Sequence, residues 1–527
     1  MNMRRKNKML HNIKMYEKEC FWGGTTVRGC DNPIDRNSEY AEDFRKECVN
    51  QTMPLFLSNK GRYIWCDKPF KVDIKDGVIS IETDGELEVA QAGNTLKEAY
   101  LAAMKKHFPF DGKKLPEEFF TTAQYNSWME FTYFPTQKGL LEYAHDIIDN
   151  GFEPGIFIID EGWHGRYGDW EFDAARFPNP KAMVDELHKL GFKVMLWVVP
   201  LVTADGYDFV MNIRPDLNKR GDAKEIFLRT KNGQPAIVNW WNGRSAILDF
   251  RKQCDADFLD RQLKHLINDY GIDGFKFDGG SVAMYHIGNV INGLVRDDHD
   301  AHAMNIAWNE FGRKYDYHEY KDTYLGAGKN CIQRLCDRGH RWENGGIDTL
   351  IPCSVMQGLM GTPFICPDMI GGGEWSHAKG ENFVIDEELF IRMAQCSALC
   401  PMMQFSWAPW RVLSENGLKA VRNAAMLHKK FAPYIMQLVN KCETDGEPIL
   451  RNLEYNCPGH GFEYVKDEFM LGEDILVCPS VVKGEFEKTV VFPQGTWIDE
   501  NGREYEGLTV CKVASPLEKL LWFKKKA

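Results

Sequence analysis

The sequence predicts an α/β protein, a (β/α)8 TIM barrel flanked by an N-terminal β-sandwich-like domain and a small C-terminal β domain. Through the middle of the chain, short apolar runs alternate with stretches of helical periodicity, which is typical of parallel strands joined by helices. Both ends instead show short alternating runs broken by glycine, aspartate and asparagine. We expect the three domains to cover residues 1–115, 116–435 and 436–527.

The composition is that of a folded protein long enough for several cores, since 44% of the 527 residues are hydrophobic and 27% are charged. The 76 acidic residues outnumber the 64 basic ones, and without clustered Lys and Arg we expect no nucleic acid partner. The basic N-terminus lacks the apolar segment of a signal peptide, and no run of about 18 apolar residues follows, so we expect a cytoplasmic protein without a membrane partner. The odd number of cysteines, 15, favours reduced, buried thiols. The sequence does not determine whether the protein forms a homo-oligomer.

The two outer domains are predicted from short strands with turn residues between them. In the N-terminal domain the strand-like runs cover residues 54–61, 62–65 and 78–81. In the C-terminal domain they cover residues 469–472, 474–477, 489–492 and 495–497. Short alternating runs of this kind indicate antiparallel sheets.

The barrel is predicted from six apolar runs, each of which ends in polar or aromatic residues. The runs cover residues 155–159, 193–199, 274–277, 332–335, 363–366 and 402–405. Amphipathic stretches lie between them, such as residues 181–190, which Gly191 follows as a C-cap. The carboxyl ends of barrel strands form the active face, whereas a doubly wound sheet would gather its functional residues at one switch point. The barrel is therefore favoured.

Asp278 is the leading candidate for a nucleophile. Phe275 and Phe277 alternate with Lys276 and Asp278, so the polar pair shares one face of the strand. A neighbouring Lys lowers the pKa of a carboxyl group and keeps it ionised, and an ionised carboxylate can attack an electrophilic carbon. The alternative is a buried structural ion pair.

The segment around Asp278 resembles the nucleophile strand of glycoside hydrolase family 31, which contains retaining α-glucosidases, α-xylosidases and α-galactosidases. Other segments resemble the family in the same order along the chain, so that the resemblance covers nearly all of it: residues 54–61, 124–128, 158–163, 177–197, 240–250, 342–352, 363–372 and 469–477. Asn242 stands where the family usually has proline, and Gly279 and Gly280 follow Asp278 where the family strand often continues to a glutamate.

The resemblance implies a second carboxyl group, about 5–5.5 Å from Asp278, that acts as acid and then as base. It should lie in residues 342–352, but Asn344 occupies the aligned position, and an amide can neither donate nor accept the proton. Three interpretations stay open: Asn344 replaces an aspartate in a variant made to trap substrate, Glu343 or Asp348 is the acid, or the chain is naturally inactive. Asn344 and Gly345 also form an ordinary turn signal.

The resemblance further implies a sugar-binding site without a cofactor or metal. Asp160 matches the family aspartate that binds the hydroxyls of the non-reducing sugar, and Asp368 is a second candidate. The remaining candidates are Lys276 and Arg334, which could bind hydroxyls or hold carboxylates ionised, and Trp197, Trp241 and Trp407, whose rings could face the sugar or pack in the core. The acidic and histidine-containing residues 297–302 read as a solvated loop rather than a metal site.

These residues predict an exo-acting retaining α-glycoside hydrolase that releases the terminal sugar of a small oligosaccharide or glycoside by double displacement. Residues 367–372 resemble a branch of the family with α-galactosidase-like members, so α-galactoside leads, with α-glucoside and α-xyloside close behind. The first alternative is an inactive carbohydrate-binding pseudoenzyme of the same fold. A weaker one is a barrel enzyme for phosphorylated sugars, against which the acidic balance and the missing phosphate loop count.

Overall fold

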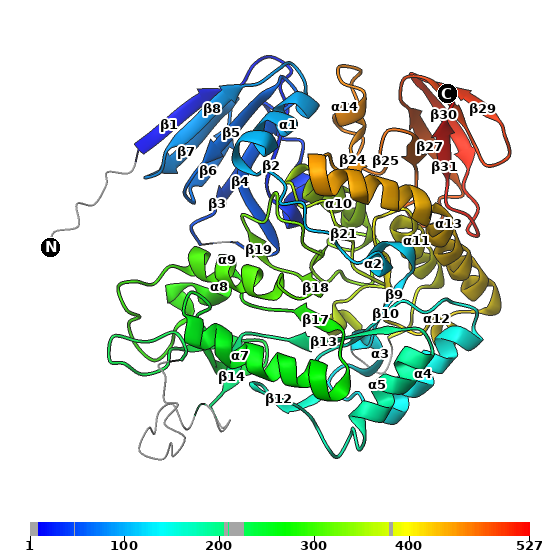
Figure 1. Cartoon of the computed structure of the whole chain (residues 1–527). Coiled ribbons are helices and arrows are strands. Elements are labelled where there is room, and N and C mark those ends of the chain that lie inside the picture. Colours follow the sequence, from blue (N-terminus) through cyan, green and yellow to red (C-terminus); the bar gives the residue numbers. More distant parts are fainter. Residues whose placement is uncertain (1–8, 47, 205–208, 210–225, 379–382, 527) are drawn as a thin grey trace. The chain divides into compact units, whose positions relative to one another are not determined.

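The computed structural model describes residues 9–46, 48–204, 209, 226–378 and 383–526 (Figure 1). It divides into two compact units that each combine separate stretches of the chain. The first unit contains Met1–Thr121, Leu325–Met403 and Pro409–Ala527, and the second contains Thr122–Tyr324 and Gln404–Ala408. The domain boundaries expected at residues 115 and 435 stay a prediction.

A parallel sheet forms the centre of the second unit, and β10, β13 and β17 lie side by side within it (Figure 1). Its order is β18 (Tyr317–Tyr320), β17 (Gly274–Phe277), β13 (Lys193–Val198), β10 (Ile156–Ile159), β9 (Gln124–Asn126) and β23 (Gln404–Phe405), each parallel to its neighbour. Helices cover parallel sheets on their faces, which explains the continuous apolar sequence of β10 and the complete burial of its residues.

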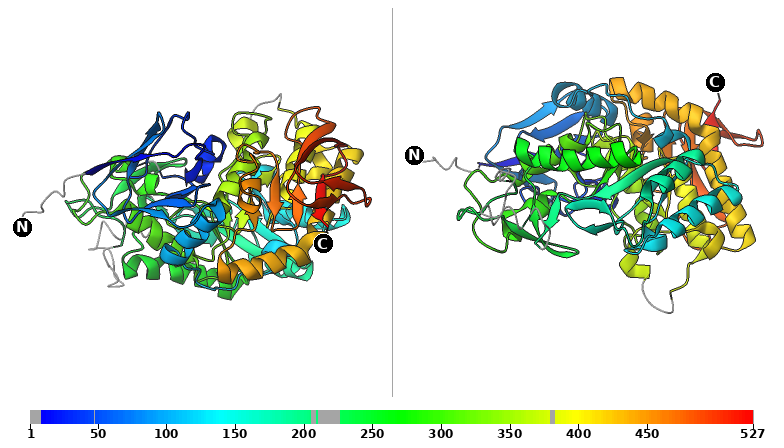
Figure 2. Two further views of the ribbon diagram at one scale, coloured as in Figure 1. Left: turned by 90° about the horizontal axis from the view of Figure 1, so that it is seen from above. Right: turned by 60° about the horizontal axis from the view of Figure 1, so that its bottom comes forward.

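The helices of the second unit begin where the sequence offers an N-cap. Thr136 accepts a hydrogen bond at the start of α4 (Gln137–Asp149), and Asn179 does so at the start of α5 (Pro180–Lys189). These two helices pack against each other, as the views in Figure 2 show. Asp300 caps α9 (Ala301–Gly312). The other helices of this unit include α3 (Trp128–Phe131), α7 (Gln253–His265) and α8 (Val282–Tyr285).

Two small antiparallel sheets of this unit begin after strands β10 and β13 of the central sheet. One pairs β11 (His164–Arg166) with β12 (Asp169–Phe172). The other has the order β14 (Leu201–Thr203), β16 (Gly243–Ile247) and β15 (Ile237–Trp240), and the turn between β15 and β16 carries Trp241.

The first unit contains two N-terminal antiparallel sheets, as the alternating sequence predicts. One has the order β1 (Met9–Lys14), β7 (Val78–Thr83), β6 (Lys71–Lys75) and β3 (Tyr40–Asp43). In the other, β4 (Gln51–Ser58) pairs with both β2 (Phe21–Thr25) and β5 (Arg62–Cys66), which pairs with β8 (Leu87–Gln91). The short helix η1 (Thr26–Asp31) follows β2, and α1 (Leu96–His107) and α2 (Glu118–Thr121) follow the sheets.

The first unit also contains short parallel strands and the longest described helix. Strand β20 (Gln333–Arg334) pairs in parallel with β21 (Ile365–Cys366). Between and after them lie η5 (Ile347–Thr349), α10 (Leu350–Leu359), β22 (Met369–Ile370), η6 (Trp375–Ala378), α11 (Glu387–Ala398), α12 (Pro409–Val412) and α13 (Glu415–Asp445). None of the helices in the described part of the chain has both the length and the apolar sequence that a membrane span requires.

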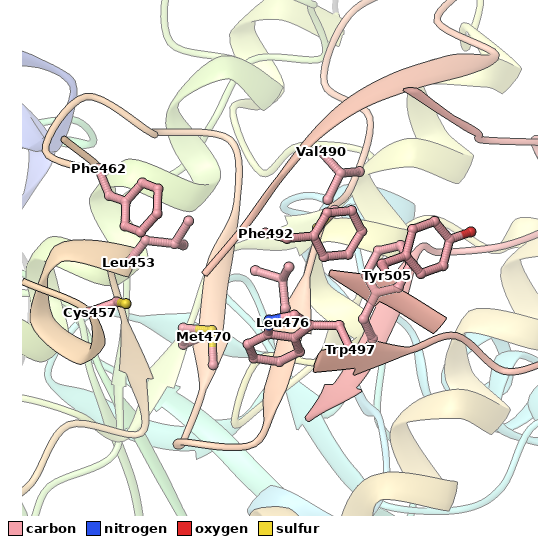
Figure 3. Packing of buried hydrophobic residues seen from close by; sticks show 11 residues of the cluster. Leu453, Cys457, Phe462, Met470, Leu476, Val490, Phe492, Trp497 and Tyr505 are labelled. Atoms are coloured by element: carbon pink, nitrogen blue, oxygen red, sulfur yellow. The ribbon is translucent and has the colours of Figure 1, made fainter. Parts of the chain in front are cut away.

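The C-terminal part of the first unit is a β domain with its own apolar core (Figure 3). Phe492 stacks on Tyr505 with ring centroids 4.9 Å apart, and Met470, Leu476 and Trp497 pack in the same cluster. The main sheet has the order β24 (Leu450–Arg451), β25 (Phe469–Leu471), β26 (Ile475–Val477), β31 (Trp522–Lys525), β28 (Thr496–Ile498) and β29 (Glu504–Glu506), while β27 (Glu487–Phe492) pairs with β30 (Thr509–Ala514) and α14 (Leu453–Asn456) precedes β25.

Candidate active site

Three carboxyl groups lie at the carboxyl ends of neighbouring strands in the second unit. Asp160 and Glu161 follow β10, and Asp278 follows β17. All three are buried, with exposures of 3%, 3% and 7%. Carboxyl groups kept out of water at this edge of a parallel sheet are where barrel enzymes place their chemistry.

Asp278 is held by groups that stabilise its ionised form. The indole Nε1 of Trp197 donates a hydrogen bond to Oδ2 at 3.0 Å, and the backbone N–H of Gly279 donates to Oδ1 at 2.8 Å. The ammonium of Lys321, just past the end of β18, lies 3.8 Å from Oδ1. Donors and a nearby cation favour a carboxylate over a carboxylic acid, so Asp278 is arranged to act as a nucleophile.

The expected partnership between Lys276 and Asp278 is wrong. Lys276 instead pairs with Asp160, with Nζ 2.5 Å from Oδ2, and both side chains are almost fully buried. Residues two apart on a strand share a face but are separated by about 6.6 Å along it, so the end of a neighbouring strand offers a closer carboxylate. A cation beside Asp278 is Lys321, which could not be singled out from the sequence because β18 reads as a polar segment.

Asp160 is fixed in orientation by a second donor. The amide of Asn126, at the end of β9, donates to Oδ2 at 2.7 Å, and the backbone N–H of Asp160 donates to Ser127 Oγ at 2.8 Å. Lys276 and Asn126 both approach Oδ2, whereas Oδ1 accepts the backbone N–H of Glu161. Asp160 is therefore a preorganised acceptor that does not depend on a loop for its position.

Glu161 is a site residue that the sequence analysis did not single out. Tyr167 donates to Oε1 at 2.8 Å, Trp241 donates to Oε2 at 3.2 Å, and the amide of Asn242 also donates to Oε1. Burial raises the pKa of Glu161 to about 8, with the charges of Asp160 and Asp278 adding to the rise and the donors opposing it. Its position directly after Asp160 at a strand end was the signal that could have identified it.

The three candidate tryptophans differ in their surroundings. Trp197 is 1% exposed and lies with its ring beside His164, so it belongs to the core as well as to the site. Trp241 is 50% exposed, and a Cβ added to Gly279 would lie 3.5 Å from its Cη2, which places the ring beside the residue that follows Asp278. Trp407 is partly buried and follows β23, which pairs with β9. Trp197 and Trp241 thus contact two of the three carboxyl groups at the strand ends. Trp407 follows a strand that β9 separates from β10 in the sheet.

Arg334 and Asp368 come together in the first unit. The guanidinium of Arg334 donates to Asp368 Oδ1 at 2.7 Å and to Asp337 Oδ1 at 2.9 Å. The backbone N–H groups of Arg338 and Gly373 donate to Asp368 Oδ2 at 2.6 and 3.1 Å. Burial raises the pKa of Asp368 to about 6, although the charge of Arg334 opposes the rise. Arg334 holds a carboxylate, which was one of its two expected roles.

Asn344 lies in a turn of the first unit. It is exposed, with φ at +58°, and Gly345 follows with φ at +91°. Glu343 is also exposed, whereas Asp348 accepts the backbone N–H of Gly346 at 2.9 Å. Asn344 therefore has the left-handed conformation that asparagine tolerates in turns, and the side chains of Glu343 and Asn344 are open to solvent.

The acidic residues 297–302 take part in ordinary local contacts. Asp297 pairs with Lys231 at 2.5 Å, and Asp300 accepts the backbone N–H groups of His302 and Ala303 at the start of α9. Among the residues described, no group of three or more His, Cys, Asp and Glu side chains could hold a metal ion.

Two family models match the chain. Residues 113–438 match the model described as "Glycosyl hydrolases family 31 TIM-barrel domain", and residues 446–526 match "Glycosyl hydrolase family 31 C-terminal domain". The predicted fold class is thereby confirmed.

Curated relatives are similar over much of the chain. A "Myogenesis-regulating glycosidase" of Mus musculus is 28% identical over 439 residues, covering 81% of this chain and 59% of its own length. A "1,3-alpha-isomaltosidase" of Kribbella flavida is 27% identical over 382 residues, covering 65% and 49%. The chain thus spans between about half and three fifths of the length of these relatives.

Solved structures show the same fold. A Flavobacterium johnsoniae GH31 dextranase complexed with glucose superposes with a TM-score of 0.81 at 20% identity, covering 99% of this chain and 67% of that one. A GH31 α-xylosidase from a soil metagenome, complexed with xylose, gives a TM-score of 0.80 at 20% identity, covering 99% and 79%.

Proposed function

Because the chain belongs to glycosyl hydrolase family 31, we propose that it is an exo-acting, retaining α-glycosidase in which Asp278 is the nucleophile. The observation that carries the proposal is the environment of Asp278, where Trp197, Gly279 and Lys321 hold a buried carboxylate at a strand end. Lys321 offsets its charge, so the carboxylate can stay ionised without being fully solvated.

In the first chemical step, Asp278 attacks the anomeric carbon while an acid protonates the departing glycosidic oxygen, which leaves a covalent glycosyl-enzyme. In the second step, water attacks the same carbon and the former acid takes up a proton. Asp160 supplies a fixed acceptor for sugar hydroxyls, and the exposed ring of Trp241 offers an apolar surface for the C–H face of a sugar.

The identity of the acid is part of the proposal. We assign the acid position to residue 344, where an aspartate would complete the pair, and the asparagine then slows the first step. The alternatives are Glu343, which is exposed, and Asp348, whose carboxylate accepts the N–H of Gly346. An aspartate at 344 restores fast hydrolysis under the first assignment only.

For the sugar, residues 367–372 favour an α-galactoside. The names of similar proteins, which include α-glucosidases of Bacillus thermoamyloliquefaciens and Saccharolobus solfataricus, favour an α-glucoside as the second candidate, with an α-xyloside third. Assays of Asn344→Asp on nitrophenyl α-galactoside, α-glucoside and α-xyloside rank the three by kcat/KM. Free small-molecule glycosides and oligosaccharides are the proposed substrates.

Trapping of the covalent intermediate tests the nucleophile. A 5-fluoroglycosyl fluoride of the preferred sugar should label the peptide that contains Asp278, because the fluorine slows both steps and the activated leaving group lets the intermediate accumulate. Asp278→Asn should remain unlabelled while keeping the far-UV circular dichroism of the parent. A label on another carboxyl group would overturn the assignment.

A carbohydrate-binding protein without turnover is the alternative function, and Asn344 is the observation that favours it. It predicts that Asn344→Asp binds a sugar in calorimetry but releases no nitrophenol from any glycoside of the panel. Hydrolysis by Asn344→Asp that is abolished by a further Asp278→Asn change would exclude it.

A further inference from the structure

Two cysteines from distant parts of the sequence come together in the first unit. Cys30 lies in η1, and Cys353 lies in α10, against which η1 packs. A Cβ added to Gly29 would lie 2.7 Å from both the Cα and the backbone nitrogen of Cys353. Since consecutive Cα atoms are about 3.8 Å apart, Cys30 follows within one residue of this close approach.

The thiols point toward the same small region. The Cys353 thiol donates to the carbonyl of Val27 at 3.6 Å, and the Cys30 thiol donates to the carbonyl of Asp348 at 3.8 Å. The Cys353 thiol therefore contacts η1, which carries Cys30, and the Cys30 thiol contacts η5, which directly precedes the helix of Cys353. The two thiols are also hydrogen-bonded to each other. Neither cysteine is part of a disulfide.

The surroundings make this pair chemically reactive. The hydrogen bond from Cys30 and the charge of Arg338 lower the pKa of Cys353 to about 7, against the effect of its burial. Cys30 is partly exposed, whereas Cys353 is buried. The hydrogen bond to Cys353 and burial raise the pKa of Cys30, so Cys353 is the member of the pair that ionises near neutral pH. A thiol hydrogen-bonded to a thiolate, with one of the two partly exposed, has the properties of a redox-sensitive cysteine pair.

We propose that Cys30 and Cys353 form a redox modification site, which a low-molecular-weight disulfide such as oxidised glutathione converts into an intramolecular disulfide. The Cys353 thiolate takes the proton of Cys30 as the Cys30 sulfur attacks one sulfur of oxidised glutathione, which gives a mixed disulfide and expels one glutathione thiolate. That thiolate accepts the proton of Cys353, whose sulfur attacks Cys30 and expels the second glutathione. The protein loses two electrons and two protons, and one oxidised glutathione becomes two reduced ones.

The pKa values of other buried thiols distinguish them from Cys353. Burial raises the pKa of the Cys396, Cys400 and Cys478 thiols, which are buried and far from being thiolates at neutral pH. Cys336 is the competing thiol, because it also lies near Arg338, but burial raises its pKa to about 11. The disulfide would join η1 to α10, the helix that begins six residues after Asn344, at Leu350.

Peptide mass spectrometry under non-reducing conditions tests the proposal without any substrate. The reduced protein is incubated with oxidised glutathione at pH 7.5, alkylated and digested. We expect one cross-linked peptide pair containing Cys30 and Cys353, lighter by two hydrogen atoms than the sum of the two peptides and lost on reduction. Cys511→Ser, which removes another partly exposed thiol, should give the same cross-link.

Cys30→Ser should abolish the cross-link and leave Cys353 to be alkylated only slowly in the folded state. A link between Cys336 and Cys353, or full alkylation of both Cys30 and Cys353 after the incubation, would overturn the proposal. Alkylation of Cys30 and Cys353 is measured on the protein without substitutions, so this test remains valid even if Cys30→Ser does not fold.

Discussion

Trp197 and Asp278 illustrate how a single hydrogen bond can serve both packing and chemistry. The indole is almost fully buried, and its one polar atom donates to the carboxylate at 3.0 Å. A buried indole N–H needs a partner, and an ionised carboxylate gains from a donor, so each residue satisfies the other.

Trp197→Phe should lower kcat/KM by roughly ten- to a hundredfold, because a hydrogen bond to a charged group is worth about 1.5–3 kcal/mol. The measurement is steady-state kinetics on the preferred nitrophenyl glycoside in the Asn344→Asp background. Trp170→Phe is the matched control, since that buried indole packs near Trp197. Equal losses in the two variants would show that the effect comes from packing.

Glu161 should make stability depend on pH. Its pKa rises from 4.5 to about 8 on folding, so between these values the folded state keeps a proton that the unfolded state has lost. Stability contributed by this group is therefore complete below pH 4.5 and is lost as pH rises through 8. Asp160, Asp278, Tyr133 and Tyr167 are the titratable groups that interact with it.

Glu161→Gln should remove this dependence, because the amide oxygen can still accept from Tyr167 and Trp241 but does not titrate. Relative to the parent, the variant should gain about 2–4 kcal/mol between pH 5 and pH 9. Thermal unfolding of both proteins at pH 5, 7 and 9 provides the comparison, and a constant difference in midpoint across this range would contradict it. Other carboxyl groups with raised pKa values, such as Glu454 and Glu468, are present in both proteins. Their contribution therefore cancels when the stability of the variant is compared with that of the parent.

Among the elements, the turn after β17 is tightly constrained. Gly280 has φ at +67°, and a Cβ there would lie 2.5 Å from Cδ1 of Trp308. The amide of Asn305 also donates to the carbonyl of Gly280 at 2.8 Å, which fixes the turn against α9. This turn sets the direction in which the chain leaves Asp278.

Gly280→Ala should destabilise the protein by about 2–4 kcal/mol, since it combines a strained backbone conformation with a steric clash. Gly233→Ala is the matched control, because Gly233 has φ at +79° but open space around its Cβ position, and it should cost only about 1 kcal/mol. Thermal unfolding of the two variants gives the comparison. Similar losses would mean that backbone strain alone accounts for both.

The sequence predicts elements best where composition and periodicity agree. The runs at 155–159, 193–199 and 274–277 correspond to β10, β13 and β17, and the amphipathic stretch at 181–190 to α5. Strand β18 was not predicted, because the polar residues His318 and Glu319 make its sequence resemble that of a loop. Both residues are buried in the structure. Their burial depends on groups such as Gln404, which donates to Glu319 from a strand far along the chain, and no local pattern reveals that.

For the whole molecule, the fold class could be predicted and is confirmed by the family match, because strand and helix periodicities persist over hundreds of residues. The site could be predicted only in part. Asp160 and Asp278 follow from strand ends, but the choice of Lys321 over Lys276 as the cation beside Asp278 depends on the alignment of neighbouring strands. Pairings of this kind are set by tertiary structure.

The leaving-group dependence of the reaction tests the catalytic assignment for the whole molecule. Asn344→Asp should raise kcat/KM by about 10²–10⁴ on glycosides with poor leaving groups, because protonation then assists departure. The gain should be much smaller on nitrophenyl glycosides, whose leaving group departs as an anion. Kinetics on an alkyl and a nitrophenyl glycoside measure the two gains, and equal gains would contradict an acid role for residue 344.

Trp197 on β13 is aligned with Lys276 on β17, and the N–H of Asp278 donates to the carbonyl of Val198 at 2.9 Å. A deletion of one residue within β13 would turn the indole to the opposite face of the strand and leave Asp278 without this donor. Length changes in homologous chains should therefore be confined to the segments that connect these strands, while the spacing within the strands is kept.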